Sequence, residues 1–253
     1  MKLLGLARDL RRRKARERRG LFVAEGVRAV EELLASSLDV HGALIVTAPR
    51  PDARAAALRA ALEARGVPVE AVSAADFASA ADTDSPQGVL AVAAVPTRAL
   101  TGVTLSPGRP LLLLDGLQDP GNVGTIIRTA AAFDAAATLA LPGTVDLWNA
   151  KVVRSAMGAL FNYPALSCTW DAFDAFRADG HVAVWGADAR GAALDPGAAR
   201  PERLALVVGN EGAGLSGDAH ARATQLVALP ITGRVESLNA AVAAGILLYE
   251  LTR

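Results

Sequence analysis

One segment near the carboxyl end of the chain limits the possible folds more than any other. Residues 226–250 read LVALPITGRVESLNAAVAAGILLYE, a short apolar run that ends at Pro230, a polar stretch, and an alanine-rich stretch after Asn239. A short apolar run before a proline is typical of a buried strand, and an alanine-rich stretch is typical of a helix. The segment therefore predicts a strand, a tight loop and a helix, with Ser237 and Asn239 in the first turn of the helix.

Small polar side chains at the start of a helix have two common uses. They cap backbone N–H groups that lack a partner within the helix, or they contact a ligand in that locally positive region. For Ser237 alone we favour the cap. A ligand site needs polar partners from elsewhere in the chain, and two other stretches provide them.

The composition favours helices packed closely on a sheet, because 52% of the 253 residues are hydrophobic but only 4% are aromatic. The formal net charge is zero, yet the first twenty residues carry nine Lys and Arg against Asp9 and Glu17. A basic segment on an otherwise acidic chain favours contact with a polyanion. The alternative is a solvated arm, which explains most charge runs.

Several classes of protein are disfavoured. The single cysteine, Cys168, excludes an internal disulfide and a cysteine-based zinc site, and the three histidines lack metal-ligand spacing, so we expect no metal. No apolar run is long enough to span a membrane, and the basic amino-terminal segment lacks the apolar core of a signal peptide. We therefore expect a soluble, cytoplasmic protein with no membrane partner.

Strands and helices are predicted to alternate along the whole chain, which indicates an α/β fold. Residues 2–19 favour one helix that Gly20 ends, and residues 96–110 are rich in Pro, Gly and Thr and favour a linker. We assign a small first domain to residues 1–97, a linker to 98–110 and a second domain to 111–253. Strands are expected at 43–47, 67–72, 89–95, 111–114, 138–141, 181–185 and 204–208, and helices of the second domain at 122–133, 147–157 and 171–178.

The first polar stretch, residues 115–129, reads DGLQDPGNVGTIIRT and follows a predicted buried strand. In an open α/β sheet, ligands bind beyond the carboxyl ends of the strands, where this stretch would lie. Asn122 stands just before the predicted helix, and Arg128 follows within two turns. Isoleucines and alanines flank Arg128, a setting in which a guanidinium seldom lies without an anion. The alternative is a capped helix with a surface arginine.

The second stretch, residues 206–215, runs from a strand into a glycine-rich turn, LVVGNEGAGL. Its glycine order differs from the dinucleotide-binding pattern, and it lacks the lysine of a phosphate-binding loop. By itself this turn is as well explained by a plain loop as by a ligand site. The set of three polar loops, each after a predicted strand, is more specific than any one of them.

Together the three stretches resemble the SpoU (TrmH) family of RNA ribose 2′-O-methyltransferases, within the SPOUT superfamily. The matching motifs are D-x-x-x-D-P-x-N-x-G-x-x-x-R-T at 115–129, G-x-E-G at 209–212, and L-P-I followed by S-L-N-A-A-V-A within 229–243. The first domain carries F-V-A-E-G at 22–26 and S-P-Q-G-V at 85–89. It resembles the L30e-like, RNA-binding substrate domain that many members have.

The resemblance implies an α/β fold with a mostly parallel sheet tied in a trefoil knot, which the residue pattern alone does not predict because knots are very rare. It also implies S-adenosylmethionine as methyl donor and a homodimer formed through the knotted domain. The positions that match the family's catalytic residues are Asn122, Arg128, Glu211, Ser237 and Asn239. Those expected to hold the donor are Gly209, Gly212, Leu229, Ile231 and Leu238, and those expected to contact RNA are Arg11, Arg12, Arg13, Lys14, Arg18 and Arg19.

Roles for these residues follow from the chemistry that the resemblance implies. Because a guanidinium practically never loses its proton, we expect Arg128 to clamp a phosphate and the developing alkoxide rather than to act as a base. Ser237 and Asn239 would orient the hydroxyl and the donor. Glu211 would brace the loops by accepting hydrogen bonds from backbone N–H groups, and a direct base role is less favoured.

The implied substrate is structured RNA, and the separate first domain favours ribosomal RNA over transfer RNA. A non-catalytic RNA-binding or ribosome-assembly protein of the same fold is the main competing hypothesis, although the intact polar positions argue against it. A different nucleotide-binding α/β enzyme is a remote third possibility, because the glycine order and the missing lysine do not fit.

Overall fold

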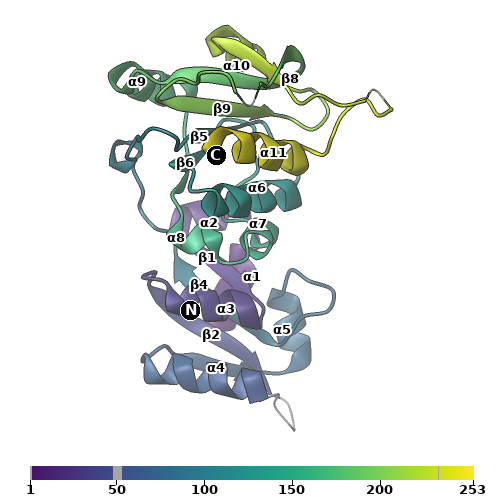
Figure 1. Ribbon diagram of the computed structural model, residues 1–253. Coiled ribbons are helices and arrows are strands. Elements are labelled where there is room, and N and C mark those ends of the chain that lie inside the picture. Colours follow the sequence, from purple (N-terminus) through teal and green to yellow (C-terminus); the bar gives the residue numbers. More distant parts are fainter. Residues whose placement is uncertain (1, 48–52, 196, 233) are drawn as a thin grey trace. The chain divides into compact units, whose positions relative to one another are not determined.

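The computed structural model describes residues 2–47, 53–195, 197–232 and 234–253 (Figure 1). The chain forms two compact units, the first made of Met1–Thr97 and Trp148–Asn162 and the second of Arg98–Leu147 and Tyr163–Arg253. Residues 98–110, assigned to a linker from the sequence, group with the second unit, and residues 148–162 group with the first. Both units alternate strands and helices, which confirms the mixed α/β fold with a separate amino-terminal domain.

The first unit is built on a four-stranded sheet in the order β1-β4-β2-β3. β4 pairs antiparallel with β1 and β2, whereas β2 and β3 run parallel. The strands are β1 (Leu21–Glu25), β2 (Val40–Val46), β3 (Val69–Val72) and β4 (Val89–Ala94), and three helices of this unit are α3 (Val27–Ala35), α4 (Ala53–Ala64) and α5 (Ala74–Ala80). All five residues of β1 and the first five of β4 are buried, as expected for strands covered on both faces.

The basic amino-terminal segment forms two helices, so the prediction of one continuous helix is wrong. α1 (Leu3–Leu10) and α2 (Arg13–Arg19) are separated at Arg12, whose backbone is extended. Arg16 is buried and holds this corner, because its guanidinium donates to the carbonyl oxygens of Leu10 (2.8 Å) and Arg11 (2.9 Å). α2 ends as predicted at Gly20, which adopts a left-handed conformation.

Residues 148–162 contribute aromatic side chains to the core of the first unit. The ring of Phe22, on β1, lies 4.5 Å from that of Trp148 and 5.8 Å from that of Phe161. Two short helices occupy this segment, α7 (Ala150–Ser155) and α8 (Ala159–Asn162). The helix predicted over 147–157 is therefore too long, because left-handed backbone at Met157 and Gly158 ends it.

The second unit contains a six-stranded sheet in the order β10-β8-β9-β5-β6-β7. Every strand pair in the described sheet is parallel, which agrees with the expected mostly parallel arrangement. The strands are β5 (Leu111–Asp115), β6 (Ala137–Ala140), β7 (Ala165–Ser167), β8 (Ala183–Ala193), β9 (Leu204–Gly209) and β10 (Gln225–Ala228). Because the strands are parallel, their carboxyl ends share one edge of the sheet.

The helices of the second unit position the polar loops. They are α6 (Pro120–Ala132), α9 (Trp170–Gly180), α10 (Gly217–Arg222) and α11 (Ala240–Thr252), with a short 3-10 turn, η1 (Leu100–Gly102). α6 and α11 pack side by side (Figure 1). Asp119 caps α6 and Asn239 caps α11, so Ser237 lies in the preceding loop and not in the first helical turn. The trefoil threading stays a prediction of the family resemblance.

None of the helices within the described ranges has the length and apolar character needed to cross a membrane.

Candidate active site

Three loops meet beyond the carboxyl ends of β5, β9 and β10. Asn210 joins the first two, since its side-chain amide donates to the carbonyl oxygen of Gly116 (2.8 Å) and its Oδ1 accepts from the backbone of Gly212 (3.0 Å). Buried Asp115, the last residue of β5, accepts from the backbone N–H of Ser216 (2.7 Å). Sequence reasoning gave no role to Asn210 or Asp115, whose work is to hold these loops together.

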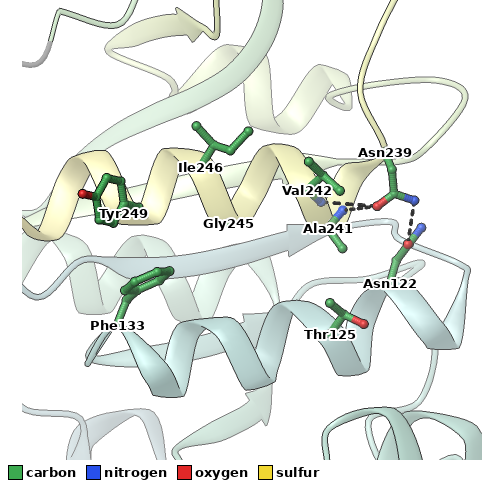
Figure 2. A pocket seen from close by; sticks show the side chains of 9 residues that line it. All are labelled: Asn122, Thr125, Phe133, Asn239, Ala241, Val242, Gly245, Ile246 and Tyr249. Carbon is green, nitrogen blue, oxygen red and sulfur yellow. Dashed lines mark hydrogen bonds between the residues drawn. The ribbon is translucent and has the colours of Figure 1, made fainter.

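A chain of hydrogen bonds links three of the five predicted catalytic residues, one from each loop. Glu211 Oε1 accepts from the side-chain amide of Asn122 (3.2 Å), and Asn122 Oδ1 accepts from the side-chain amide of Asn239 (3.0 Å). Asn239 Oδ1 in turn accepts from the backbone N–H groups of Ala241 and Val242, at the start of α11 (Figure 2). Residues that are 89 and 117 positions apart in the sequence thus form one continuous network.

Glu211 makes the kind of hydrogen bonds that the predicted role as a brace requires. Its two carboxylate oxygens accept from the backbone N–H groups of Gln118 (3.2 Å) and Asp119 (3.1 Å). Partial burial acts to raise the pKa of this carboxyl group, but hydrogen bonds to backbone N–H groups and to Asn122 outweigh it and leave the pKa below its ordinary value. Glu211 is therefore ionised at neutral pH and is occupied as an acceptor, which disfavours a base role.

A hollow of about 360 Å³, which we call the loop hollow, lies among these loops. The predicted residues that line it are Gly209, Glu211, Gly212, Leu229, Ile231, Ser237 and Leu238. All five residues expected to hold the donor are thus brought together. Residues 187–190 of β8 also line the hollow, and sequence reasoning missed them because they sit within a predicted strand-and-loop region without a recognisable motif.

Position 209 must be a glycine because the backbone of residues 214 and 215 lies too close for a side chain. A Cβ atom at this position would lie 2.3 Å from the carbonyl carbon of Gly214 and 2.5 Å from the backbone nitrogen of Leu215. The glycine therefore lets the 209–214 turn fold back on itself, closed by reciprocal hydrogen bonds of 2.9 Å between the backbones of Asn210 and Gly214.

A second hollow, of about 480 Å³, lies between α6 and α11 and is called here the helix hollow (Figure 2). Asn122 and Asn239 line it, so these two residues face the helix hollow and not the loop hollow. Its α11 side chains are apolar and unusually exposed, with Val242 at 51% and Tyr249 at 48%. The ring of Tyr249 lies 5.8 Å from that of Phe133, the residue that follows α6.

Arg128 stands apart from both hollows. Its side chain is exposed and makes no hydrogen bond or ion pair with any described residue, whereas its neighbours Ile126 and Ile127 are buried on the other side of α6. The interpretation that an apolar setting encloses this guanidinium is therefore wrong. Arg128 does follow Thr125 by three residues on α6, and Thr125 lines the helix hollow, so the two residues are neighbours on the surface of that helix.

The six predicted RNA-binding residues are all exposed, and we call them the basic corner. Two of them lie between α1 and α2, and the other four lie on α2. Asp9 organises three of them, because its carboxylate pairs with Arg12, with Arg18 (3.3 Å) and with Arg19 (3.1 Å). Hydrogen bonds first from Arg12 and then from Arg19 hold the pKa of Asp9 below its ordinary value. Arg13 pairs with Glu17 at 2.7 Å.

Across the described residues, no group of three or more His, Cys, Asp and Glu side chains is close enough to hold a metal ion.

Comparison with known proteins agrees with this geometry. The sequence pattern of the SpoU rRNA Methylase family matches residues 109–249, and that of the MRM3-like substrate binding domain matches residues 6–91. The chain therefore belongs to the SpoU rRNA methylase family, which confirms the resemblance and places it among methyltransferases.

Two curated relatives and one solved structure illustrate the similarity. The 23S rRNA (guanosine(2553)-2′-O)-methyltransferase RlmP of Bacillus subtilis is 35% identical over 96% of this chain and 93% of its own. The 23S rRNA (adenosine(1067)-2′-O)-methyltransferase of Streptomyces laurentii is 34% identical over 78% of this chain and 73% of its own. The SpoU methyltransferase AviRb of Streptomyces viridochromogenes, solved with AdoMet, superposes with a TM-score of 0.86 at 28% identity, covering 100% of this chain and 97% of that one.

Proposed function

We propose that this protein transfers a methyl group from S-adenosylmethionine to a ribose 2′-hydroxyl of ribosomal RNA. The observation that carries the proposal is the Glu211–Asn122–Asn239 network beside the loop hollow. Both curated relatives described above are named for 2′-O-methylation of 23S rRNA. One is named for a guanosine and the other for an adenosine, so membership of the family does not by itself select the base.

The loop hollow fits the donor in size and chemistry. Its volume lies within the range of small-molecule sites. Apolar side chains of Val227, Leu229 and Leu247 line it together with polar groups at Asn210 and Ser237, a combination suited to an adenosine with an amino-acid tail. When bound, the donor supplies an electrophilic methyl group on its sulfonium, so no metal is required in this proposal. Gly209, Gly212, Leu229, Ile231 and Leu238 would hold it through their backbone.

The remaining site residues act on the ribose. Arg128 would clamp a phosphate and the alkoxide that develops as the 2′-hydroxyl loses its proton, since a guanidinium stays charged and offers several donors. Asn239 and Ser237 would orient the hydroxyl, and Asn122 with Glu211 would keep Asn239 in place. This division assigns the charge chemistry to exposed Arg128 and leaves Asn239 held in place by its hydrogen bonds to Asn122 and to the start of α11.

A homodimer formed through the second unit would complete this site. The apolar side chains of Val242, Ile246 and Tyr249 form a contiguous exposed face on α11, the kind of surface that marks a protein interface. Asn122 and Asn239 border the same face, and Arg128 lies one helical turn after Thr125, which also lines the helix hollow. In a two-fold dimer, the arginine of one protomer would then act at the loop hollow of its partner. Ile246→Glu should give a monomer by light scattering.

The first unit would hold the RNA through the basic corner, which presents exposed cations on α2 and on the connection that precedes it. A cytoplasmic location follows from a ribosomal RNA substrate and belongs to the same proposal.

The test is a map of 2′-O-methyl groups on total RNA from cells with and without the gene. We expect one mark on 23S rRNA to disappear on deletion and to return with the wild-type gene but not with Arg128→Ala. Loss of a transfer RNA mark instead would replace ribosomal with transfer RNA as the substrate. An unchanged map, together with no binding of S-adenosylmethionine in titration calorimetry, would favour the non-catalytic RNA-binding hypothesis.

A further inference from the structure

β8 loses its pairing with β10 over five residues at the wall of the loop hollow, a stretch that we call the excursion. Gly186 lies opposite Leu226 of β10, but the next pair joins Ala192 to Val227, so residues 187–191 have no partner on β10. Irregularities of this kind often redirect side chains next to active sites. Here the excursion places residues 187–190 on the wall of the loop hollow.

Two residues shape the excursion. Asp188 Oδ1 accepts from the backbone N–H of Arg190 (2.8 Å), which closes a tight turn. Gly191 brings the strand back, because a Cβ atom there would lie 2.5 Å from the carbonyl carbon of Leu226. The carboxylate of Asp188 also pairs with the guanidinium of Arg190 (2.9 Å) and lies 3.7 Å from Nε2 of His220.

The two charges of this pair differ in their exposure to water. The side chain of Asp188 is 9% exposed, whereas that of Arg190 is 80% exposed. Both side chains line the hollow. Because water screens the exposed guanidinium more than the carboxylate, we expect the pair to leave a small negative potential there. Hydrogen bonds from Arg190 hold the pKa of Asp188 at about 2, so the carboxylate is charged at neutral pH.

Two other carboxylates lie on this wall. Glu211 also carries a negative charge, but its oxygens accept from N–H groups of Gln118, Asp119 and Asn122 and hold the loops together. Glu236 is exposed to solvent, where its charge is screened. Asp188 is therefore the acidic group on this wall whose charge can be changed without breaking hydrogen bonds between the loops.

We propose that Asp188 makes the loop hollow prefer the cationic methyl donor over its neutral product. S-adenosylmethionine carries a sulfonium and has a net charge of +1 at neutral pH. Transfer of its methyl group leaves S-adenosylhomocysteine, a thioether with no net charge. A fixed negative charge in the wall thus stabilises the donor complex selectively and favours release of the product. This inference rests on the proposed function, because it assumes that the loop hollow binds the donor.

The test is titration calorimetry of the full-length protein with S-adenosylmethionine, S-adenosylhomocysteine and sinefungin, an analogue with an ammonium group near the sulfonium position. Asp188→Asn removes the charge but keeps an oxygen that accepts from the Arg190 N–H, so the turn should persist. We expect its Kd for the two cationic ligands to rise about fivefold to tenfold, and that for S-adenosylhomocysteine to stay within about twofold.

Arg190→Gln is the matched control, because it removes the opposite, screened charge from the same turn. We expect it to leave or slightly tighten binding of the cationic ligands. Equal weakening of all three ligands by Asp188→Asn, or no weakening of any, would overturn the charge role and leave the proposed function standing. If the wild-type protein binds neither S-adenosylmethionine nor its product, the proposed function itself fails.

Discussion

The network at the carboxyl ends of the second unit's strands and the basic corner of the first unit are both built from polar side chains, but they differ in range. Asn122 bonds to partners 89 and 117 positions away, whereas Asp9 pairs with arginines 3, 9 and 10 positions away. The first arrangement exists only when the whole sheet has formed. The second needs two neighbouring helices and the corner held by Arg16.

This difference suggests a division of labour. A long-range network fixes groups to the accuracy that chemistry on a bound hydroxyl needs, since catalytic donors lose effect when displaced by small distances. A local, exposed cluster offers charge, which attracts a phosphate backbone with little demand on geometry. Substitutions in the two regions should therefore fail in different ways.

The largest effect is expected at Arg128. Arg128→Ala should lower the rate of methyl transfer by at least about 10²–10³, the usual cost of losing an oriented charged donor. Because Arg128 lines neither hollow, the Kd for S-adenosylmethionine should not change. Single-turnover kinetics with donor binding measured in parallel would check both statements. Near-normal turnover would remove Arg128 from the chemistry.

Mixing of subunits sharpens the same prediction. Arg128→Ala protomers mixed with Gly209→Val protomers, which should not bind the donor, are expected to recover about a quarter of the wild-type activity. Half of the dimers would be mixed, and each would contain one intact site if the arginine acts on the partner. Absence of any recovery, with exchange of subunits verified, would show that Arg128 serves its own protomer.

Neutralising the basic corner should produce the next largest effect. Changing its six cations to glutamine should weaken RNA binding and reduce the slope of log K against log salt by about 0.7–0.9 for each RNA phosphate that is no longer neutralised. Substitution is preferable to removal of residues 1–19, because Ala7 and Leu10 belong to the core. Neutralising Arg28, Arg54, Arg59 and Arg65, which are also exposed, is the control. If the control reduced the slope of log K against log salt equally, the basic corner would not be the specific RNA-binding surface.

Gly209→Ala should weaken donor binding about tenfold or more, since the new Cβ meets backbone atoms that cannot move independently. Gly102→Ala is the matched control, because nothing lies within 4 Å of the added atom. Titration calorimetry would measure donor binding, and thermal unfolding would show whether the substitution also destabilises the fold. A donor Kd equal to that of the control would mean that the 209–214 turn does not shape the site.

The smallest effect is expected from Glu211→Gln on stability, and it depends on pH. The folded state lowers the pKa of Glu211, so its ionised form stabilises the fold above the unfolded pKa of about 4.3. That contribution is lost as the pH falls through the lower, folded-state pKa. The difference in unfolding free energy between wild type and variant should therefore be largest near neutral pH and shrink in acid. If this difference in unfolding free energy instead grew in acid, Glu211 would not stabilise the fold through its ionised carboxylate.

Much of the fold could be predicted from the sequence where patterns are local and strong. The buried strands Leu111–Asp115 and Leu204–Gly209 stand out as apolar runs, and the glycine-rich turn and Asn239 mark loops that converge. β7 has only three residues, and α10 consists of small and polar residues, so neither carries an apolar pattern that could be recognised. The break at Arg12 was missed because basic residues favour helix on both sides of it.

Three other features depend on tertiary contacts and could not be predicted from the sequence. The grouping of residues 148–162 with the first unit depends on ring contacts of Phe22 with Trp148 and Phe161, which no local pattern reveals. Arg128 has apolar neighbours in sequence, but a helix places them on its other side. The excursion at Asp188 arises from a change of register between β8 and β10, which is invisible in either strand alone.

The three converging loops are proposed to support transfer of a methyl group to a ribose hydroxyl of ribosomal RNA. A decisive assay incubates the purified protein with methyl-labelled S-adenosylmethionine and unmodified 23S rRNA, and then hydrolyses the RNA in alkali. We expect the label to stay in a single alkali-resistant dinucleotide, because a methylated 2′-oxygen cannot attack the neighbouring phosphate. Label in a free mononucleotide, which indicates a methylated base, would contradict the proposal, as would no incorporation by a protein that binds the donor.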